Sequence, residues 1–333
     1  MRYNQSTFDE GEWEEKRMTT QCLKNFPVTL FASVMGITGL SIAYLRYSSI
    51  HNFVYGVGIG LLALAIFIFL FISVVYGAKY IRHRDEVLKE FHHPIKANFF
   101  PAISISLMLL AVALYDFHFL FSALLWGLGS LLQLVLTITL ISRWITRSYE
   151  ITHSNPTWFI PVVGNIIVPI AGVDFVDKEI LWFFFSIGLF FWISLFSIIF
   201  YRLIFHPQIA QKFVPTLFIL IAPPALGFIS YIRLTGDMDI AARILLYLAL
   251  FFVLLLLSMV KYFTQLTFSV SWWAYTFPLC GVTIASIMAT RLLSSTIMTT
   301  IASALLLLTS CVIAVVFTKT VIALCNKSLC EEE

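Results

Sequence analysis

The chain has 333 residues, of which 60% are hydrophobic and 12% are charged, and its formal net charge is +3. A water-soluble domain of this size needs many more charged residues to cover its surface, so the composition predicts an all-α integral membrane protein. No basic tract indicates nucleic acid as a partner.

Apolar segments long enough to cross a hydrocarbon core of roughly 30 Å recur along the chain. Ten can be counted, at residues 25–45, 53–76, 99–115, 117–141, 156–173, 180–205, 214–232, 240–262, 266–292 and 295–323. Most connections are very short, so consecutive segments should be antiparallel neighbours. We therefore expect a single domain over residues 25–325, built from five helical hairpins and flanked by tails at 1–24 and 326–333. The longest connection, residues 77–98, is expected to be a helix extension followed by a turn.

The basic residues are unevenly divided between the two sides of this arrangement. Sixteen of the 21 Lys and Arg residues fall on the side of both tails, and five fall on the other side. Because basic residues are retained on the cytoplasmic side, this asymmetry predicts cytoplasmic termini and a multi-pass protein of the plasma, or bacterial inner, membrane.

Proline is confined to alternate segments. The prolines inside or at the mouth of segments are Pro27, Pro101, Pro156, Pro161, Pro169, Pro215, Pro223, Pro224 and Pro278, and all nine lie in odd-numbered segments. Broken backbone at membrane depth is tolerated where it is buried in protein or lines a water-filled cavity. We therefore expect an inner ring of kinked odd helices around a pore, with the even helices forming an outer ring. Small polar residues such as Asn165 are also found mainly within the odd-numbered segments.

The ninth segment contains the run SVSWWAYTFPLCGVTIAS, with Phe277 directly before Pro278. Pro278 should free the carbonyl of Ala274 and bend the helix. Ala274 and Gly281 lie on the helical face of Phe277 and leave space around its ring. Two interpretations of Phe277 stay open at this point, a pore gate and an ordinary core aromatic.

Several chemistries are missing from the sequence. No Asp or Glu lies deep in any segment, and no TVGYG filter is present, which disfavours a cation pathway and classical proton coupling. HExxH and GxGD are absent, and the histidines lie at membrane edges or in loops, so we expect no enzyme activity, no metal site and no cofactor. Small anions remain as candidates for the transported ion.

Three stretches together resemble a known family: SVSWWAYTFPLCGVT, PTWFIPVVGNIIVPIAG and HPIKANFFPAISIS. They are similar to the tellurite-resistance/C4-dicarboxylate transporter (TDT) family, which includes TehA-like proteins and the slow-type anion channels of plant guard cells. The resemblance implies a homotrimer in which each protomer has its own pore, lined by the odd helices and occluded by Phe277. It also implies conduction of small anions such as chloride or nitrate, or, as the alternative, secondary transport of C4-dicarboxylates such as malate or of oxyanions such as tellurite. The candidate lining residues are Pro27, Pro101, Pro161, Pro169, Pro223, Pro224, Pro278, Asn165, Ala274 and Gly281.

Overall fold

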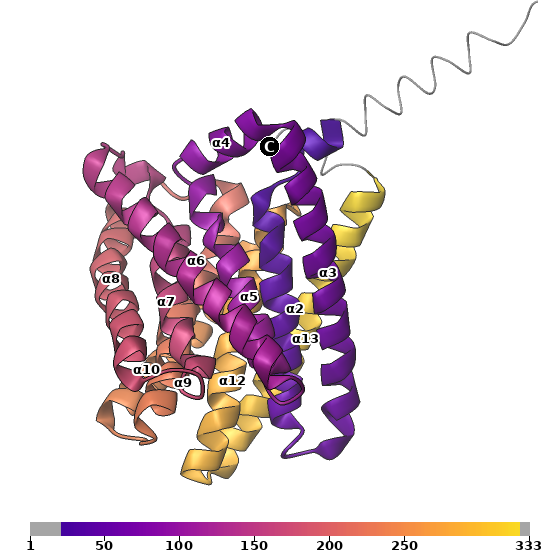
Figure 1. Ribbon diagram of the computed structural model, residues 1–333. Coiled ribbons are helices and arrows are strands. Elements are labelled where there is room, and N and C mark those ends of the chain that lie inside the picture. The colour runs from indigo at the N-terminus through magenta and orange to yellow at the C-terminus, as the bar shows by residue number, and fades with distance from the viewer. Residues whose placement is uncertain (1–20, 327–333) are drawn as a thin grey trace, which may run out of the picture.

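The computed structural model describes residues 21–326, which fold into helices joined by short turns, with no strand in this range (Figure 1). Nine of the described helices are long and apolar enough to cross a membrane, and a shorter apolar helix covers Pro156–Gly172. The prediction of an all-α fold built from long apolar helices is confirmed. Most of the predicted tails, at 1–20 and 327–333, lies outside the described residues.

The α-helices follow one another with few intervening residues. Their bounds are α2 Phe31–Tyr47, α3 Tyr55–Arg82, α4 Arg84–His92, α5 Pro101–Leu114, α6 Phe119–Thr146, α7 Phe159–Gly172, α8 Lys178–Phe205, α9 Ala222–Thr235, α10 Ile240–Ser258, α11 Val260–Thr264, α12 Thr276–Leu293 and α13 Thr296–Cys325. Where a helix extension and a turn were expected, at 77–98, α3 continues to Arg82 and α4 forms as a separate helix.

Five helices close into a ring. α2 contacts α5, α5 contacts α7, α7 contacts α9, α9 contacts α12, and α12 contacts α2. In the ring segments that contain α2, α5, α9 and α12, 67–89% of the most apolar stretch is buried, against 22–33% for α3, α6, α8, α10 and α13. Each of these less buried helices packs against the ring helix that precedes it in the chain. The ring is therefore the core of the molecule, and the other five long helices surround it.

Every ring helix begins with a 3-10 segment. These segments are η1 (Val28–Leu30) before α2, η3 (Lys96–Phe99) before α5, η5 (Pro156–Trp158) before α7, η6 (Gln211–Ile221) before α9 and η7 (Val270–Tyr275) before α12. Most of the odd-segment prolines stand at these junctions: Pro101 is the first residue of α5, and Pro223 and Pro224 lie in the first turn of α9. A proline in the first turn lacks only an N–H that the helix leaves unbonded anyway.

The bend expected at Pro278 takes a different form from the one predicted. Pro278 is the third residue of α12, and the chain before it is the 3-10 segment η7. The segment is therefore not one α-helix kinked in its middle. Its two parts meet at the start of the α-helix, where a proline destabilises the helix least.

Glycines let α2 and α12 approach closely. A Cβ added at Gly36 would overlap the hydroxyl of Thr276, and one added at Gly39 would lie 2.8 Å from Cβ of Cys280. Small residues at a helix interface allow two backbones to pack in the membrane without the hydrophobic driving force that operates in water. This seam completes the ring between its first and last helices.

A buried amide joins three helices elsewhere in the molecule. Gln133 of α6 is fully buried; its Oε1 accepts a hydrogen bond from the Ser104 hydroxyl of α5 at 2.6 Å, and its Nε2 donates to the Pro161 carbonyl of α7 at 2.7 Å. Gly164 provides the space, because a Cβ there would overlap the Gln133 side chain. Gln133 thus joins an outer helix to two ring helices.

A buried ion pair holds α4 against the end of α3. The Lys79 ammonium lies 3.0 Å from the Glu90 carboxylate and donates to the Phe26 carbonyl at 2.8 Å, while the Tyr76 hydroxyl donates to the same carboxylate at 2.9 Å. Lys79 is 2% exposed, so the pair is removed from water. Lys79 of α3 therefore joins three segments of the chain, since it bonds both to Glu90 of α4 and to Phe26 before α2.

Candidate functional site: two cavities inside the helix ring

An apolar cavity lies at the 3-10 end of the ring, and all five ring helices contribute to it. Its volume is about 40 Å³. The lining residues share small or apolar side chains: Ala32, Met35, Phe99, Ala102, Ile105, Phe159, Ile160, Val163, Gly164, Ile167, Ile219, Ala222, Leu226, Trp273, Ala274, Phe277 and Pro278. The one N–H among these side chains, on Trp273, donates to the Thr320 hydroxyl at 3.0 Å.

Phe277 is the second residue of α12 and is 8% exposed. Its ring reaches the backbone of α2, since a Cβ added at Gly39 would lie 3.7 Å from its Cδ2. Ala274 and Pro278 line the same cavity. The sequence argument placed Ala274 and Gly281 on the face of Phe277, and of these two only Ala274 lines this cavity with it. Gly281 faces α9 instead, where its missing Cβ would lie 3.7 Å from Ala225.

The first turns of the ring helices surround this cavity, which gives it a particular electrostatic character. The N-terminal end of a helix carries a partial positive charge of about half an elementary charge. The prolines at the junctions remove some of the N–H groups that could otherwise bind an anion tightly. An anion at this end of the ring would meet a favourable field with few strong hydrogen-bond donors.

A second, larger cavity lies at the opposite end of the ring and has a volume of about 310 Å³. The C-terminal ends of the five ring helices line it with charged and apolar side chains: Ile42, Arg46, Val112, Tyr115, Asp116, Ile170, Ala171, Asp174, Ile229, Arg233, Ile284, Ile287, Met288 and Arg291. Because each ring helix ends here and begins at the apolar cavity, all five run in the same direction.

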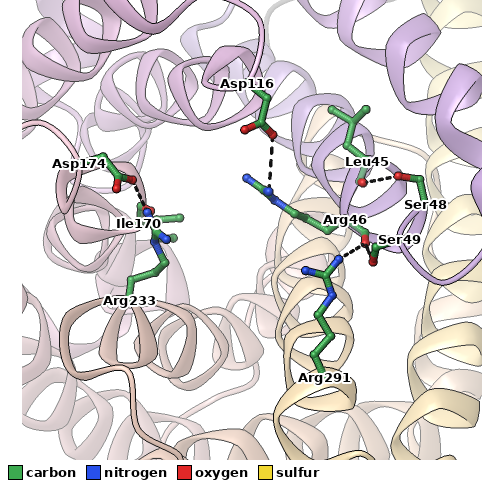
Figure 2. A network of polar contacts seen from close by, with 9 residues as sticks. All are labelled: Leu45, Arg46, Ser48, Ser49, Asp116, Ile170, Asp174, Arg233 and Arg291. Carbon is green, nitrogen blue, oxygen red and sulfur yellow. Dashed lines mark hydrogen bonds and ion pairs between the residues drawn. The ribbon is translucent and has the colours of Figure 1, made fainter.

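Ion pairs from different helices face each other across this larger cavity (Figure 2). Arg46 lies 3.6 Å from Asp116, and Arg233 is paired with Asp174 and also donates from its Nε to the Ile170 carbonyl at 3.0 Å. Arg291 donates to the backbone carbonyl of Arg46 at 3.5 Å. Within the described residues no carboxylate pairs with Arg291, so three arginines meet two aspartates and one positive charge is unbalanced.

Sequence reasoning did not single out these arginines and aspartates, although a signal was present. Arg46, Arg233 and Arg291 stand at the ends of odd segments, and Asp116 and Asp174 directly follow two others. The C-terminal ends of parallel helices in a ring lie at the same end of the ring, so charged residues at these positions must lie around one cavity. The prediction used the three arginines only in the count of basic residues, and the two aspartates only as acidic residues that do not lie deep in a segment.

The remaining predicted lining residues lie elsewhere in the ring helices. Pro27, Pro101, Pro161, Pro169, Pro223 and Pro224 line neither cavity. Asn165 is fully buried in α7, and its Nδ2 donates to the Thr137 hydroxyl of α6 at 2.9 Å. That bond places the amide nitrogen at the contact between an inner and an outer helix.

The sequence was compared with family models and with known proteins. The family model described as SLAC1, voltage-dependent anion channel, matches residues 25–321. The chain is 26% identical over 287 residues to the S-type anion channel SLAH3 of Arabidopsis thaliana, covering 82% of this chain and 44% of that protein. It is 27% identical over 289 residues to the uncharacterized transporter MJ0576 of Methanocaldococcus jannaschii, covering 79% and 83% of the two chains. It is 23% identical over 277 residues to the tellurite resistance protein TehA homolog of Haemophilus influenzae, covering 81% and 83%.

The chain spans about half the length of the plant relatives, 44% of SLAH3 and 53% of SLAH2. The family model, in contrast, extends over nearly all of the described helices, from residue 25 to residue 321. The chain therefore belongs to the SLAC1 family of voltage-dependent anion channels.

Proposed function

We propose that the chain conducts small anions, such as chloride or nitrate, across the membrane through the centre of the helix ring. One observation carries this proposal: five parallel helices begin at one cavity and end at another, and the two cavities lie inside the same ring. Membership in a family of channels and transporters supports it.

The potential at the two cavities has different sources. At the apolar end, the converging helix N-termini supply positive potential, and the lining holds no carboxylate. At the wide end, the charge of Arg291 offsets part of the negative potential from the C-terminal ends of the ring helices. Weak, distributed attraction of this kind suits conduction, which needs entry without tight binding.

Phe277 is the proposed gate. The cavity that it lines is apolar and much smaller than the cavity at the other end of the ring, and the ring of Phe277 lies between α12 and Gly39 of α2. An apolar constriction of this size blocks ions by excluding their water. Movement of one aromatic ring would widen it without rebuilding the helices.

The proposed arrangement in the membrane is ten spans in five hairpins, with the ring helices and their 3-10 starts inside and the other five long helices outside. The shortest span, η5 with α7, has three 3-10 and fourteen α-helical residues, which gives about 27 Å of length. We place the 3-10 end, α4 and both tails in the cytoplasm, because most of the basic residues lie there. The family resemblance supports a homotrimer in the plasma or bacterial inner membrane, with residues 25–325 as the conducting domain.

Reversal potentials in purified proteoliposomes or planar bilayers test this function. A channel for anions predicts discrete current steps and a reversal potential that moves by roughly 59 mV for a tenfold chloride gradient. Nitrate and malate gradients then rank the permeant anions.

The rival function is secondary transport of dicarboxylates or oxyanions. A carrier would show saturation, counterflow and no current steps, because substrate and protein rearrange in each cycle. If protein that assembles normally gives this result, the chain is a carrier and the channel proposal is wrong.

A further inference from the structure

A third cavity lies outside the ring, between the end of α8, the segment η6 and the end of α10. Its volume is about 380 Å³. Apolar side chains form most of its wall, and the lining residues are Phe200, Arg202, Leu203, Gln208, Ile209, Val214, Leu217, Leu220, Leu255, Leu256, Met259 and Tyr262. No acidic residue is among them.

Arg202 is the unusual member of this wall. It stands in the last turn of α8 and is only 4% exposed. Its Nε and Nη1 have no hydrogen-bond partner among the described residues. The other buried cation, Lys79, has both a carboxylate and a backbone carbonyl within 3.0 Å.

A buried guanidinium without a counter-charge is costly, because desolvation is not repaid by an ion pair. The C-terminal end of α8 offers only a fraction of a negative charge. An anion with several oxygens would satisfy the two unbonded nitrogen atoms, and guanidinium groups bind phosphate well through such charge-assisted hydrogen bonds.

The surroundings of Arg202 favour a phosphate that carries a hydrocarbon chain. The wall beyond the guanidinium is apolar, and exposed apolar side chains continue outward from it, with Phe205 of α8 69% exposed and Leu257 of α10 41% exposed. Both helices belong to the less buried set that surrounds the ring. Basic pockets between membrane helices on the cytoplasmic side are suited to anionic lipid headgroups.

We propose that this cavity binds an anionic phospholipid, with the headgroup phosphate at Arg202 and an acyl chain along the wall formed by Leu217, Leu255 and Leu256. The site is separate from both cavities of the ring. It does not depend on whether the ring conducts anions.

Native mass spectrometry and thermal melting of the purified full-length protein test the proposal. The probes are phosphatidylglycerol, phosphatidylcholine and free glycerol phosphate. Wild type should retain phosphatidylglycerol in preference to phosphatidylcholine and melt at a higher temperature with it. Arg202→Gln should weaken phosphatidylglycerol binding by about tenfold or more, since it removes charge-assisted hydrogen bonds.

Arg147→Gln is the matched control, because Arg147 follows the last turn of α6 at the same end of the molecule and is exposed. It should leave the lipid preference unchanged. Leu255→Trp keeps Arg202 but fills the groove, and it should also abolish the preference, so the proposal stays testable if Arg202→Gln does not fold.

Three results would overturn the proposal. Equal binding of phosphatidylglycerol by wild type and by Arg202→Gln would show that Arg202 holds no lipid. Equal stabilisation by glycerol phosphate would assign the site to a free phosphate. Loss of oligomer in Arg202→Gln without any lipid dependence would show that a neighbouring subunit supplies the missing anion.

Discussion

A few individual residues determine the charge of the larger ring cavity. The Arg46–Asp116 and Arg233–Asp174 pairs are each neutral as a pair, and Arg291 adds a positive charge next to them. Exposed pairs of this kind contribute little to stability. Under the proposed function, their arrangement matters more for ions that enter the cavity than for the fold.

Arg291→Gln should lower anion conductance at low ionic strength by about threefold, because one unit charge about 7 Å from a passing ion in water changes the local anion concentration by that factor. The difference should shrink at high salt, where screening is strong. Arg243→Gln, on the same side but outside the cavity, serves as the control. Equal conductance of Arg291→Gln and wild type at every salt concentration would remove Arg291 from the pathway.

His93, between α4 and η3, links stability to pH. Its Nδ1 accepts hydrogen bonds from the backbone N–H groups of Ile95 and Lys96, both at 3.1 Å, which requires the unprotonated nitrogen. Burial lowers the pKa of His93 below its usual value, and the charges of Lys96, Lys212 and His153 lower it further.

A pKa that is lower in the folded state than in the unfolded state means that the unfolded chain binds the proton first. The stability contributed by His93 is therefore complete above about pH 6.5 and is lost as the pH falls through the folded pKa. Melting temperatures should fall across this window for wild type and fall less for His93→Asn, which keeps an acceptor oxygen but does not titrate. Parallel curves for the two proteins would contradict this assignment.

At the scale of single residues, the sequence indicated part of the lining of the apolar cavity. The aromatic beside a proline, with Ala274 on its face, was visible in the ninth segment, and Phe277, Pro278 and Ala274 do share a cavity. Asn165 was misleading, because residue type alone does not tell which neighbour an amide will bond. The pairing of Arg46 with Asp116 depends on which helix ends meet, which a linear pattern does not contain.

At the scale of helices, proline placement was informative about location and wrong about form. Odd-segment prolines predicted irregular backbone in the helices that turned out to be the ring, and each of these helices has a 3-10 start. A mid-helix kink was expected at Pro278. Pro278 lies instead in the first turn of α12, after a 3-10 segment, where a proline removes no hydrogen bond of the α-helix. Only Pro169 lies within the interior of a ring α-helix.

Gln133 offers a test of how the outer helices are held to the ring. Gln133→Leu removes its bonds to Ser104 and Pro161, which keep other partners in the Pro101 carbonyl and the Thr137 hydroxyl, so the protein should lose about 1 kcal/mol of stability. Thermal melting in detergent measures this loss. Thr139→Val on the same helix is the control, because the Thr139 hydroxyl is exposed and bonds only to the carbonyl of Val135. A melting temperature for Gln133→Leu equal to that of the control would mean that the bridge contributes nothing.

At the scale of the whole molecule, length, hydropathy and alternation of segment types predicted the class of fold from the sequence. Closure of the ring could not be predicted in this way, because the seam between α2 and α12 depends on glycines more than 200 residues away from their partners. The cavity around Arg202 is also a product of packing between three distant segments. Both features need the fold before they can be seen.

The central claim is that the axis of the ring is an anion pathway that Phe277 closes. Anion currents of wild type, Phe277→Ala and Phe218→Ala, recorded in oocytes or planar bilayers at matched protein levels, test it most directly. Phe218 is half-buried, packs against Tyr275 and lines neither ring cavity, so Phe218→Ala is the same chemical change outside the pathway. We predict that Phe277→Ala raises the current by about tenfold or more, since it removes the apolar constriction, and that Phe218→Ala does not. A Phe277→Ala protein that assembles normally and conducts no more than wild type would contradict the account.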